Sequence, residues 1–446
     1  MARISPFSAW RFNSEKVPKV GAVISPPYDR IDSSLQQEIA ARGDLSILMV
    51  MPGNAELSAN NIDQLAARAS ETISAWQEER FLAHDPEPGI YYYRQGFVDC
   101  DGRHRVRKGF FALLDLEPEH SDVVLPQESD WTNPRVERLK LLEATEMAVA
   151  PIMLLFSDPE REVMSLLAGV AGDVEACIDT ECKDETTHSV FRLTDPETIA
   201  RVQELMAPQT VILADGHHRY RTAQAFAAAH PEIPAAHRIL ACFVPLEDDG
   251  LSLRPIHRAV TGLPEIDPND LLFKLSQIFY IRELEERKTS DELLAHIQKE
   301  MARDDEHDEA TFAAAIAGVP GILLLSVKTD AAKLALPEGL AEPIRDMDVS
   351  LLHRLVLEGP LGLDPSDRSK GVIRFFHEPE KLLSLVRDGE TQAAFLLNPP
   401  AVRSLNAVVN ARLKLPHKAA RFYPDIPAGL VMQKLTDDGS NGDSHE

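Results

Sequence analysis

Residues 211–222 read VILADGHHRYRT, and this stretch decides how the central part of the chain is built. Four apolar residues predict a buried strand that ends at Asp215, and Gly216 predicts a tight turn into a helix. A strand, a glycine turn and a helix in this order direct backbone N–H groups and the positive helix end to one point. Phosphate groups bind well at such a point.

The polar side chains of this turn indicate what it could bind. His217, His218 and Arg219 supply hydrogen-bond donors and positive charge for a phosphate. Asp215 supplies a carboxylate that can hold Mg²⁺ or accept a proton. The alternative is an ordinary tight turn in which Gly216 provides a positive φ and the charged side chains are only solvated.

The charge balance limits the classes of ligand and partner. The chain has 446 residues, with 46 Lys and Arg against 71 Asp and Glu, for a formal net charge of −25. We expect such a surface to repel nucleic acid and anionic membranes, so an anionic ligand needs a local positive pocket. The four cysteines lack C-x-x-C spacing, and no apolar run is long enough to span a membrane. We therefore expect a cytoplasmic protein whose oligomeric state is not readable from its sequence.

The order of apolar and polar segments predicts a mixed α/β fold. Residues 45–52 (LSILMVMP) are interpreted as a buried strand and residues 62–79 as an amphipathic helix. We expect the following division: an N-terminal α/β segment over 1–120, a phosphate-binding core over 121–262, an α+β domain over 263–398, a C-terminal segment that closes the cleft over 399–435, and a disordered tail over 436–446.

Three further loops contain candidate site residues. Glu128 follows a predicted strand in VLPQES, Tyr28 and Asp29 follow two prolines in SPPYDR, and Lys418 and Arg421 lie in LPHKAARFYPDI. Rigid loops often position site residues. The alternatives are a solvated glutamate, a tyrosine packed in the core and a basic pair on the surface.

Arg258, in LRPIHRAV, is a further candidate because its segment follows the strand that comes after the D-G-H-H-R helix. The sequence contains no P-loop and no G-x-G-x-x-G after a strand. A phosphate site in this chain therefore has to be built by other means.

Six motifs in one order connect the chain to a known family. They are SPPYDRI, VLPQE with RLKLLEAT and APIMLLFS, ILADGHHRYRTA, GLSLRPIHRAV, MDVSLLHRLVLEGPLG and LPHKAARFYPDIPAGLV. On these motifs, which extend over nearly the whole sequence, the chain is identified as a member of the bacterial family called domain of unknown function 1015. The family name carries no function.

A second resemblance does carry a function. The D-G-H-H-R turn, the P-Q-E loop and the late lysine resemble the free serine kinases of archaea, which belong to the ParB/sulfiredoxin-like class. This resemblance implies a ParB/sulfiredoxin-like core over 121–262, with Glu128 as the catalytic base. It also implies that Asp215, with Mg²⁺, and residues 216–219 hold the transferred phosphate, and that Lys418 adds a positive charge. The chain departs from the kinase pattern at Gln127, Ala419 and Ala420, which stand where those kinases have a histidine and two hydroxyl residues.

The resulting hypothesis is a Mg²⁺-dependent kinase that uses ATP or ADP and phosphorylates the hydroxyl of a small amino acid, with free L-serine as the expected acceptor. Phosphoryl transfer depends on positioning and positive charge more than on covalent catalysis. Tyr28, Asp29, Arg258 and Arg421 are the candidates for binding the acceptor. The alternative hypothesis is a non-enzymatic nucleotide-binding switch like those of the ParB class.

Overall fold

The strand and helix predicted around the D-G-H-H-R turn both form. Strand β11 (Val211–Asp215) has four buried residues before Asp215, and helix α6 (His217–Ala229) begins directly after Gly216. Strand β11 pairs in parallel with β6 (Val124–Pro126) and antiparallel with β8 (Ile152–Phe156). Its register with β8 shifts between Leu213 and Asp215, so the strand departs from regular pairing where the turn begins.

The computed structural model describes residues 2–436 except 42, 44, 54–59, 101, 119–120, 127–135, 264–266, 285–288, 303–309, 329–340, 346, 365–370, 401–403, 405–406, 409–410, 412, 414 and 417. The chain divides into two units. Unit 1 comprises Met1–Gln127, Trp131–Ser252 and Pro424–Glu446, and unit 2 comprises Glu128–Asp130 and Leu253–Tyr423. The predicted mixed α/β fold with an additional α+β domain is confirmed. The finer division into five segments stays a prediction, and nearly all of the expected disordered tail lies outside the described residues.

Unit 1 is built on a nine-stranded mixed sheet in the order β6-β11-β8-β12-β5-β4-β10-β9, with β1 paired to β5. Its remaining strands are β1 (Ile4–Ser5), β4 (Ile90–Val98), β5 (His104–Asp115), β9 (Ile178–Glu181), β10 (Thr187–Leu193) and β12 (Arg238–Pro245). Short pairs are formed by β2 (Trp10–Phe12) with β3 (Leu82–His84) and by β7 (Met147–Ala148) with β21 (Gln433–Lys434). The central strands are buried on both faces, as their continuous apolar runs predict.

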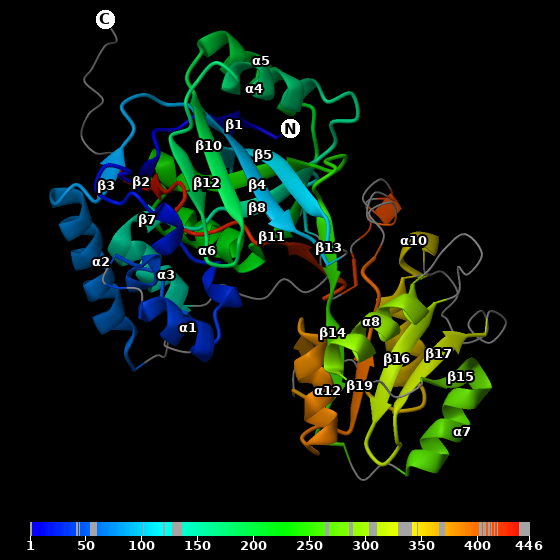
Figure 1. The fold of residues 1–446 in the computed structure, drawn as a ribbon. Coiled ribbons are helices and arrows are strands. Elements are labelled where there is room, and N and C mark those ends of the chain that lie inside the picture. Colours follow the sequence, from blue (N-terminus) through cyan, green and yellow to red (C-terminus); the bar gives the residue numbers. More distant parts are fainter. Residues whose placement is uncertain are drawn as a thin grey trace, which may run out of the picture. The chain divides into compact units, whose positions relative to one another are not determined.

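Helices α4 (Glu162–Ala171) and α5 (Pro196–Met206) cover one face of this sheet (Figure 1). Their apolar residues share one core with inward-facing residues of β4, β5, β8, β11 and β12. The other helical segments of unit 1 are η1 (Val20–Ala22), η2 (Tyr28–Arg30), α1 (Ser33–Ala40), η3 (Ile47–Met49), α2 (Ile62–Glu78), α3 (Val136–Thr145) and η4 (Pro234–His237). Helix α2 confirms the amphipathic helix expected over 62–79.

The strand expected over residues 45–52 is wrong. These residues are buried, but Ile47–Met49 form a single 3₁₀ turn, η3. The Ser46 hydroxyl accepts a hydrogen bond from the N–H of Leu48 at 3.3 Å, and this local bond favours a turn over an extended chain. An apolar run of this length fits a buried turn as well as a strand.

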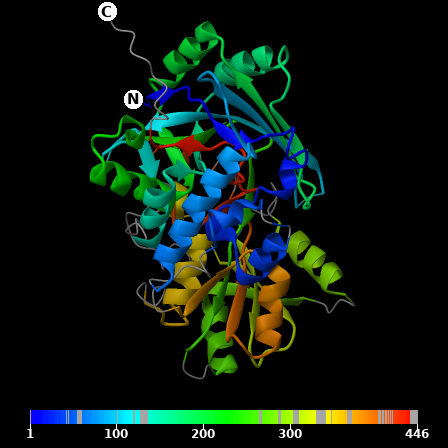
Figure 2. The same cartoon turned by 90° about the vertical axis from the view of Figure 1, so that its left-hand side faces the viewer.

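Segments near the two ends of the chain, around residues 10–25 and 428–432, lie side by side in unit 1. Trp10 pairs with Met432 and Ser25 pairs with Ala428, both antiparallel. Figure 2 shows the red C-terminal segment beside the blue N-terminal segment. As a result, residues near 28 and near 425 reach the same part of unit 1.

Unit 2 contains a six-stranded sheet in the order β15-β17-β16-β19-β14-β18. Its strands are β14 (His257–Val260), β15 (Phe279–Leu284), β16 (Thr311–Ile316), β17 (Ile322–Val327), β18 (Ile373–Phe376) and β19 (Ala393–Leu396), while β13 (Ser252–Pro255) pairs with β20 (Ala420–Tyr423). Its helical segments are α7 (Pro268–Ile278), α8 (Ser290–Met301), α10 (Glu342–Arg345), α11 (Asp348–Leu352), η5 (His353–Glu358) and α12 (Pro379–Arg387). One apolar core includes α7, α11 and η5, and a second includes α8 and α12.

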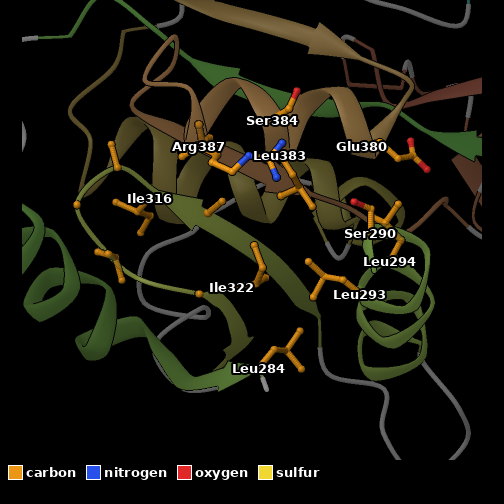
Figure 3. Close-up of a pocket in the computed structure, with 16 residues that line it drawn as sticks. Leu284, Ser290, Leu293, Leu294, Ile316, Ile322, Glu380, Leu383, Ser384 and Arg387 are labelled. Atoms are coloured by element: carbon orange, nitrogen blue, oxygen red, sulfur yellow. The ribbon is translucent and has the colours of Figure 1, made fainter. Parts of the chain in front are cut away.

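A cavity of about 510 Å³ lies where α8, α12 and the ends of β15, β16 and β17 meet (Figure 3). Its lining is mostly apolar and includes Leu284, Leu293, Ile322 and Leu383. Within the described part of the chain, no helix combines the length and apolar character needed to cross a membrane.

Candidate functional site

Gly216 allows the chain to turn from β11 into α6. Its φ is +91°, a left-handed conformation that side chains other than glycine rarely adopt. A Cβ at this position would lie 2.8 Å from Cγ2 of Ile152 and 3.0 Å from Cζ of Arg219. Glycine is therefore required here both by the backbone conformation and by the guanidinium group that lies against it.

Asp215 lies between two arginines from distant parts of the sequence. Arg219 donates through Nη2 to Oδ2 of Asp215 and through Nη1 to the carbonyl of Pro151. Arg30, from η2, donates through Nη2 to Oδ1 of Asp215 at 3.1 Å. Each oxygen of the Asp215 carboxylate thus accepts a hydrogen bond from a different guanidinium group, directly before the first turn of α6.

These contacts fix the charge state of the cluster. Burial alone would raise the pKa of Asp215, but the positive charges of Arg219 and Arg30 outweigh it and hold that pKa well below its usual range. Burial lowers the pKa of each arginine, and the neighbouring carboxylates, Asp215 first, more than compensate and raise it. All three groups are therefore ionised at neutral pH.

The C-terminal segment reaches this cluster through Asp425. Oδ1 of Asp425 lies 3.3 Å from Nε of Arg30. The segment itself is held by the interior of unit 1: Gln95 donates to the carbonyl of Asp425 at 3.0 Å, and the buried Arg107 donates to the carbonyl of Pro424. Three chain segments near residues 30, 215 and 425 thus meet in one alternating row of charges.

Tyr28 and Asp29, both predicted site residues, lie in the same turn as Arg30. Tyr28 is buried, and the guanidinium of Arg138 lies 3.6 Å from its ring centre. Oδ1 of Asp29 is buried and accepts no hydrogen bond from the described residues. A mostly apolar cavity of about 100 Å³ touches Tyr28, Arg138 and Arg219, so a small open space adjoins the turn within unit 1.

Three further predicted site residues, Arg258, Lys418 and Arg421, belong to unit 2. Arg258 is fully buried and donates to the carbonyls of Ile256 and Lys418, the latter at 2.7 Å. Lys418 has φ +54° and Arg421 is half-buried in β20. The guanidinium group of Arg258 also lies 5.4 Å from the ring centre of Phe375. The roles of Arg258 and Arg421 in binding the acceptor and of Lys418 in binding phosphate stay predictions.

Glu128, the predicted base, lies outside the described residues. The described residues do not fit a magnesium ion at Asp215, because both of its oxygens are held by guanidinium groups. Nor does the described part of the chain contain a group of three or more His, Cys, Asp and Glu side chains placed to share an ion.

Arg30 and Asp425 are the residues that inspection of the sequence missed. Both lie inside motifs that were singled out, SPPYDR and FYPD, but nothing in the sequence indicates that these motifs meet at the D-G-H-H-R turn. Two bridges between the chain ends, at Trp10 and Ser25, bring them together.

The chain has distant structural relatives, each with a TM-score of only 0.33. A conserved hypothetical protein from Pyrococcus furiosus is 15% identical over 73% of this chain and 95% of its own. A free serine kinase in complex with AMP is 12% identical over 73% and 91%. SbnI with a C-terminal truncation from Staphylococcus aureus is 11% identical over 74% and 90%.

No curated protein matches the sequence. The sequence profile of one family does, over residues 4–350, which is well over half of the chain and contains the whole of β11 and α6. The chain therefore belongs to the family described as "Protein of unknown function (DUF1015)".

Proposed function

We propose that the turn from Asp215 to Arg219 binds the phosphates of ATP or ADP, and that the protein transfers a phosphoryl group to the hydroxyl of a small amino acid, with free L-serine as the acceptor. The observation that carries this proposal is the convergence of Arg30 and Arg219 on Asp215, directly before a 13-residue helix. A positive helix end and fixed guanidinium groups are the elements that bind phosphate oxygens.

The residues of the turn have separate tasks in this proposal. The first-turn N–H groups of α6 and the side chains of His217 and His218 contact phosphate oxygens. Asp215 holds the two arginines in place, and their positive charges offset charge that develops on the transferred group. Because Asp215 stays ionised and hydrogen-bonded, it is a poor candidate for accepting the proton of the hydroxyl. That role falls to Glu128, as the resemblance to the kinases implies.

The direct test incubates the purified full chain with L-serine and either ATP or ADP, with and without Mg²⁺, and measures O-phosphoserine by mass spectrometry. We expect product with one of the two donors and none from the Glu128→Gln variant. Absence of product with both donors, under conditions where a known serine kinase is active, would overturn serine as the acceptor. Tight nucleotide binding without turnover, unchanged in Glu128→Gln, would instead favour a nucleotide-binding switch.

A further inference from the structure

The two arginines on Asp215 differ in how many of their donors are already used. Arg219 directs Nη1 to the carbonyl of Pro151 and Nη2 to Asp215, and its side chain is 9% exposed. Its Nε makes no hydrogen bond to the described residues but is buried, so it is not accessible to a ligand. Its guanidinium also lies against Gly216. The donors of Arg219 thus face the protein, and this side chain holds the turn in its conformation.

Arg30 has a different arrangement. Its Nη2 donates to Asp215 at 3.1 Å, and its buried Nε forms an ion pair with Asp425 at 3.3 Å without the geometry of a hydrogen bond. Two carboxylates therefore lie along one edge of the guanidinium plane. Its Nη1 makes no hydrogen bond to any described residue, and the side chain is 18% exposed. Arg30 therefore presents a positioned donor group that is not yet used.

From this difference, and resting on the proposed function, we infer that Arg30 is the residue that contacts the bound oxyanion through Nη1, that Arg219 braces the turn, and that Asp425 is a positioning residue for Arg30. A guanidinium group held in advance loses little conformational freedom when an anion arrives. Gln95 donates to the carbonyl of Asp425, and Arg107 donates to the carbonyl of Pro424. Because these hydrogen bonds hold Asp425 in place, the C-terminal segment contributes to this site.

The shared chemistry of the ligand is an oxyanion with two or more oxygens, which matches a guanidinium group. Two sources supply it in the proposed reaction, a phosphate of the nucleotide and the carboxylate of the amino acid. We distinguish them by titrating the full chain separately with inorganic phosphate, ADP and L-serine in a calorimeter.

The decisive variant is Arg30→Gln, with Arg11→Gln as the matched control. Arg11 also lies in unit 1, pairs with a buried carboxylate, Asp85, at 3.0 Å, and is 19% exposed. Loss of a charged hydrogen bond is expected to weaken binding by roughly ten- to a hundredfold in Arg30→Gln. Arg11→Gln should bind like the wild type. Arg30→Lys should recover part of the lost affinity, because lysine restores the positive charge but not the planar guanidinium group.

If Arg30→Gln weakens the binding of phosphate and ADP but not of serine, the nucleotide supplies the oxyanion. If it weakens the binding of serine alone, the carboxylate of the amino acid supplies it. Either outcome supports the inference. Asp425→Asn should lower the affinity for the same ligand less than Arg30→Gln does. Wild-type affinity in Arg30→Gln overturns the inference and leaves the proposed function intact. A wild-type protein that binds none of the three ligands instead contradicts the proposed function itself. Thermal melting of each variant shows whether it is folded, and Arg30→Lys serves as the test if Arg30→Gln is not.

Discussion

The turn after β11 and the cavity of unit 2 are two very different candidate sites. The cavity is large, about 510 Å³, and half of the residues that line it are leucine, isoleucine or valine (Figure 3). The turn adjoins a space of only about 100 Å³, but two arginines and two aspartates converge there through hydrogen bonds and ion pairs. Volume suits the cavity as a ligand site, whereas convergent polar groups and perturbed pKa values favour the turn.

The two regions also differ in the polar atoms that their side chains present. In the cavity, the hydroxyl of Ser384 already donates to the carbonyl of Lys381 in its own helix at 2.9 Å. At the turn, Nη1 of Arg30 and Oδ1 of Asp29 make no hydrogen bonds to described residues. Substitutions that alter one region and spare the other test this reading.

The largest expected effect comes from Asp215→Asn. The change leaves two largely buried guanidinium groups without their shared counter-charge, and removing one partner of such a cluster costs on the order of 3 kcal/mol of unfolding free energy. Phosphate binding should also be lost, because Arg30 and Arg219 are no longer held. Urea unfolding and calorimetric titration measure the two effects. A variant with wild-type stability and affinity would show that the charge cluster has neither role.

Gly216→Ala is expected to destabilise by about 2 kcal/mol, because a Cβ is unfavourable at positive φ and meets Ile152 and Arg219 here. Gly102→Ala is the matched control, since Gly102 has φ +75° and nothing within 4 Å of its Cβ position. Chemical unfolding of both variants separates the backbone cost from the crowding cost. If both variants lose the same unfolding free energy, the contacts of the new Cβ with Ile152 and Arg219 cost nothing.

Acid should remove the contribution of Asp215 to stability. Because the folded-state pKa is held below the ordinary value of about 3.9, this contribution is fully present above that value. It is lost as the pH falls from there through the folded-state pKa. The stability difference between wild type and Asp215→Asn should therefore shrink below about pH 4. Thermal melting from neutral pH down to pH 3 provides the measurement, and a constant difference would contradict the assigned ion pairs.

Chelation of Mg²⁺ is expected to leave phosphate binding unchanged. Both oxygens of Asp215 are occupied by guanidinium groups, so inorganic phosphate should bind with the same Kd in EDTA and in Mg²⁺. Calorimetry in the two buffers tests this expectation. A Kd that depends strongly on Mg²⁺ would return Asp215, or residues outside the described part of the chain, to the role of metal ligand.

The smallest effect on the turn is expected from the cavity variant Leu383→Ser. Leu383 is half-buried in the cavity wall, so the change should cost about 1–2 kcal/mol of stability. Phosphate affinity and serine phosphorylation should stay at wild-type levels. A change in either would assign the cavity a part in the function of the turn.

Prediction from the sequence succeeded where local chemistry is sufficient. The apolar run VILA, the glycine and the following polar helix specify β11, the turn and α6, because the burial pattern and positive φ depend on a few neighbouring residues. It was wrong for residues 45–52, where an apolar run is compatible with both a strand and a buried turn and Ser46 favours the turn. The positions of Glu128, Lys418 and Arg421 relative to the turn stay predictions.

Local sequence patterns were sufficient to predict the mixed α/β fold and the glycine turn between β11 and α6. Which groups face that turn depends instead on contacts that form when the chain folds. Residues 30, 215 and 425 are far apart along the chain, and pairing between the chain ends, such as Ser25 with Ala428, brings them together. Sequence patterns report local periodicity, whereas the charge state of Asp215 and the free edge of Arg30 depend on contacts between distant segments.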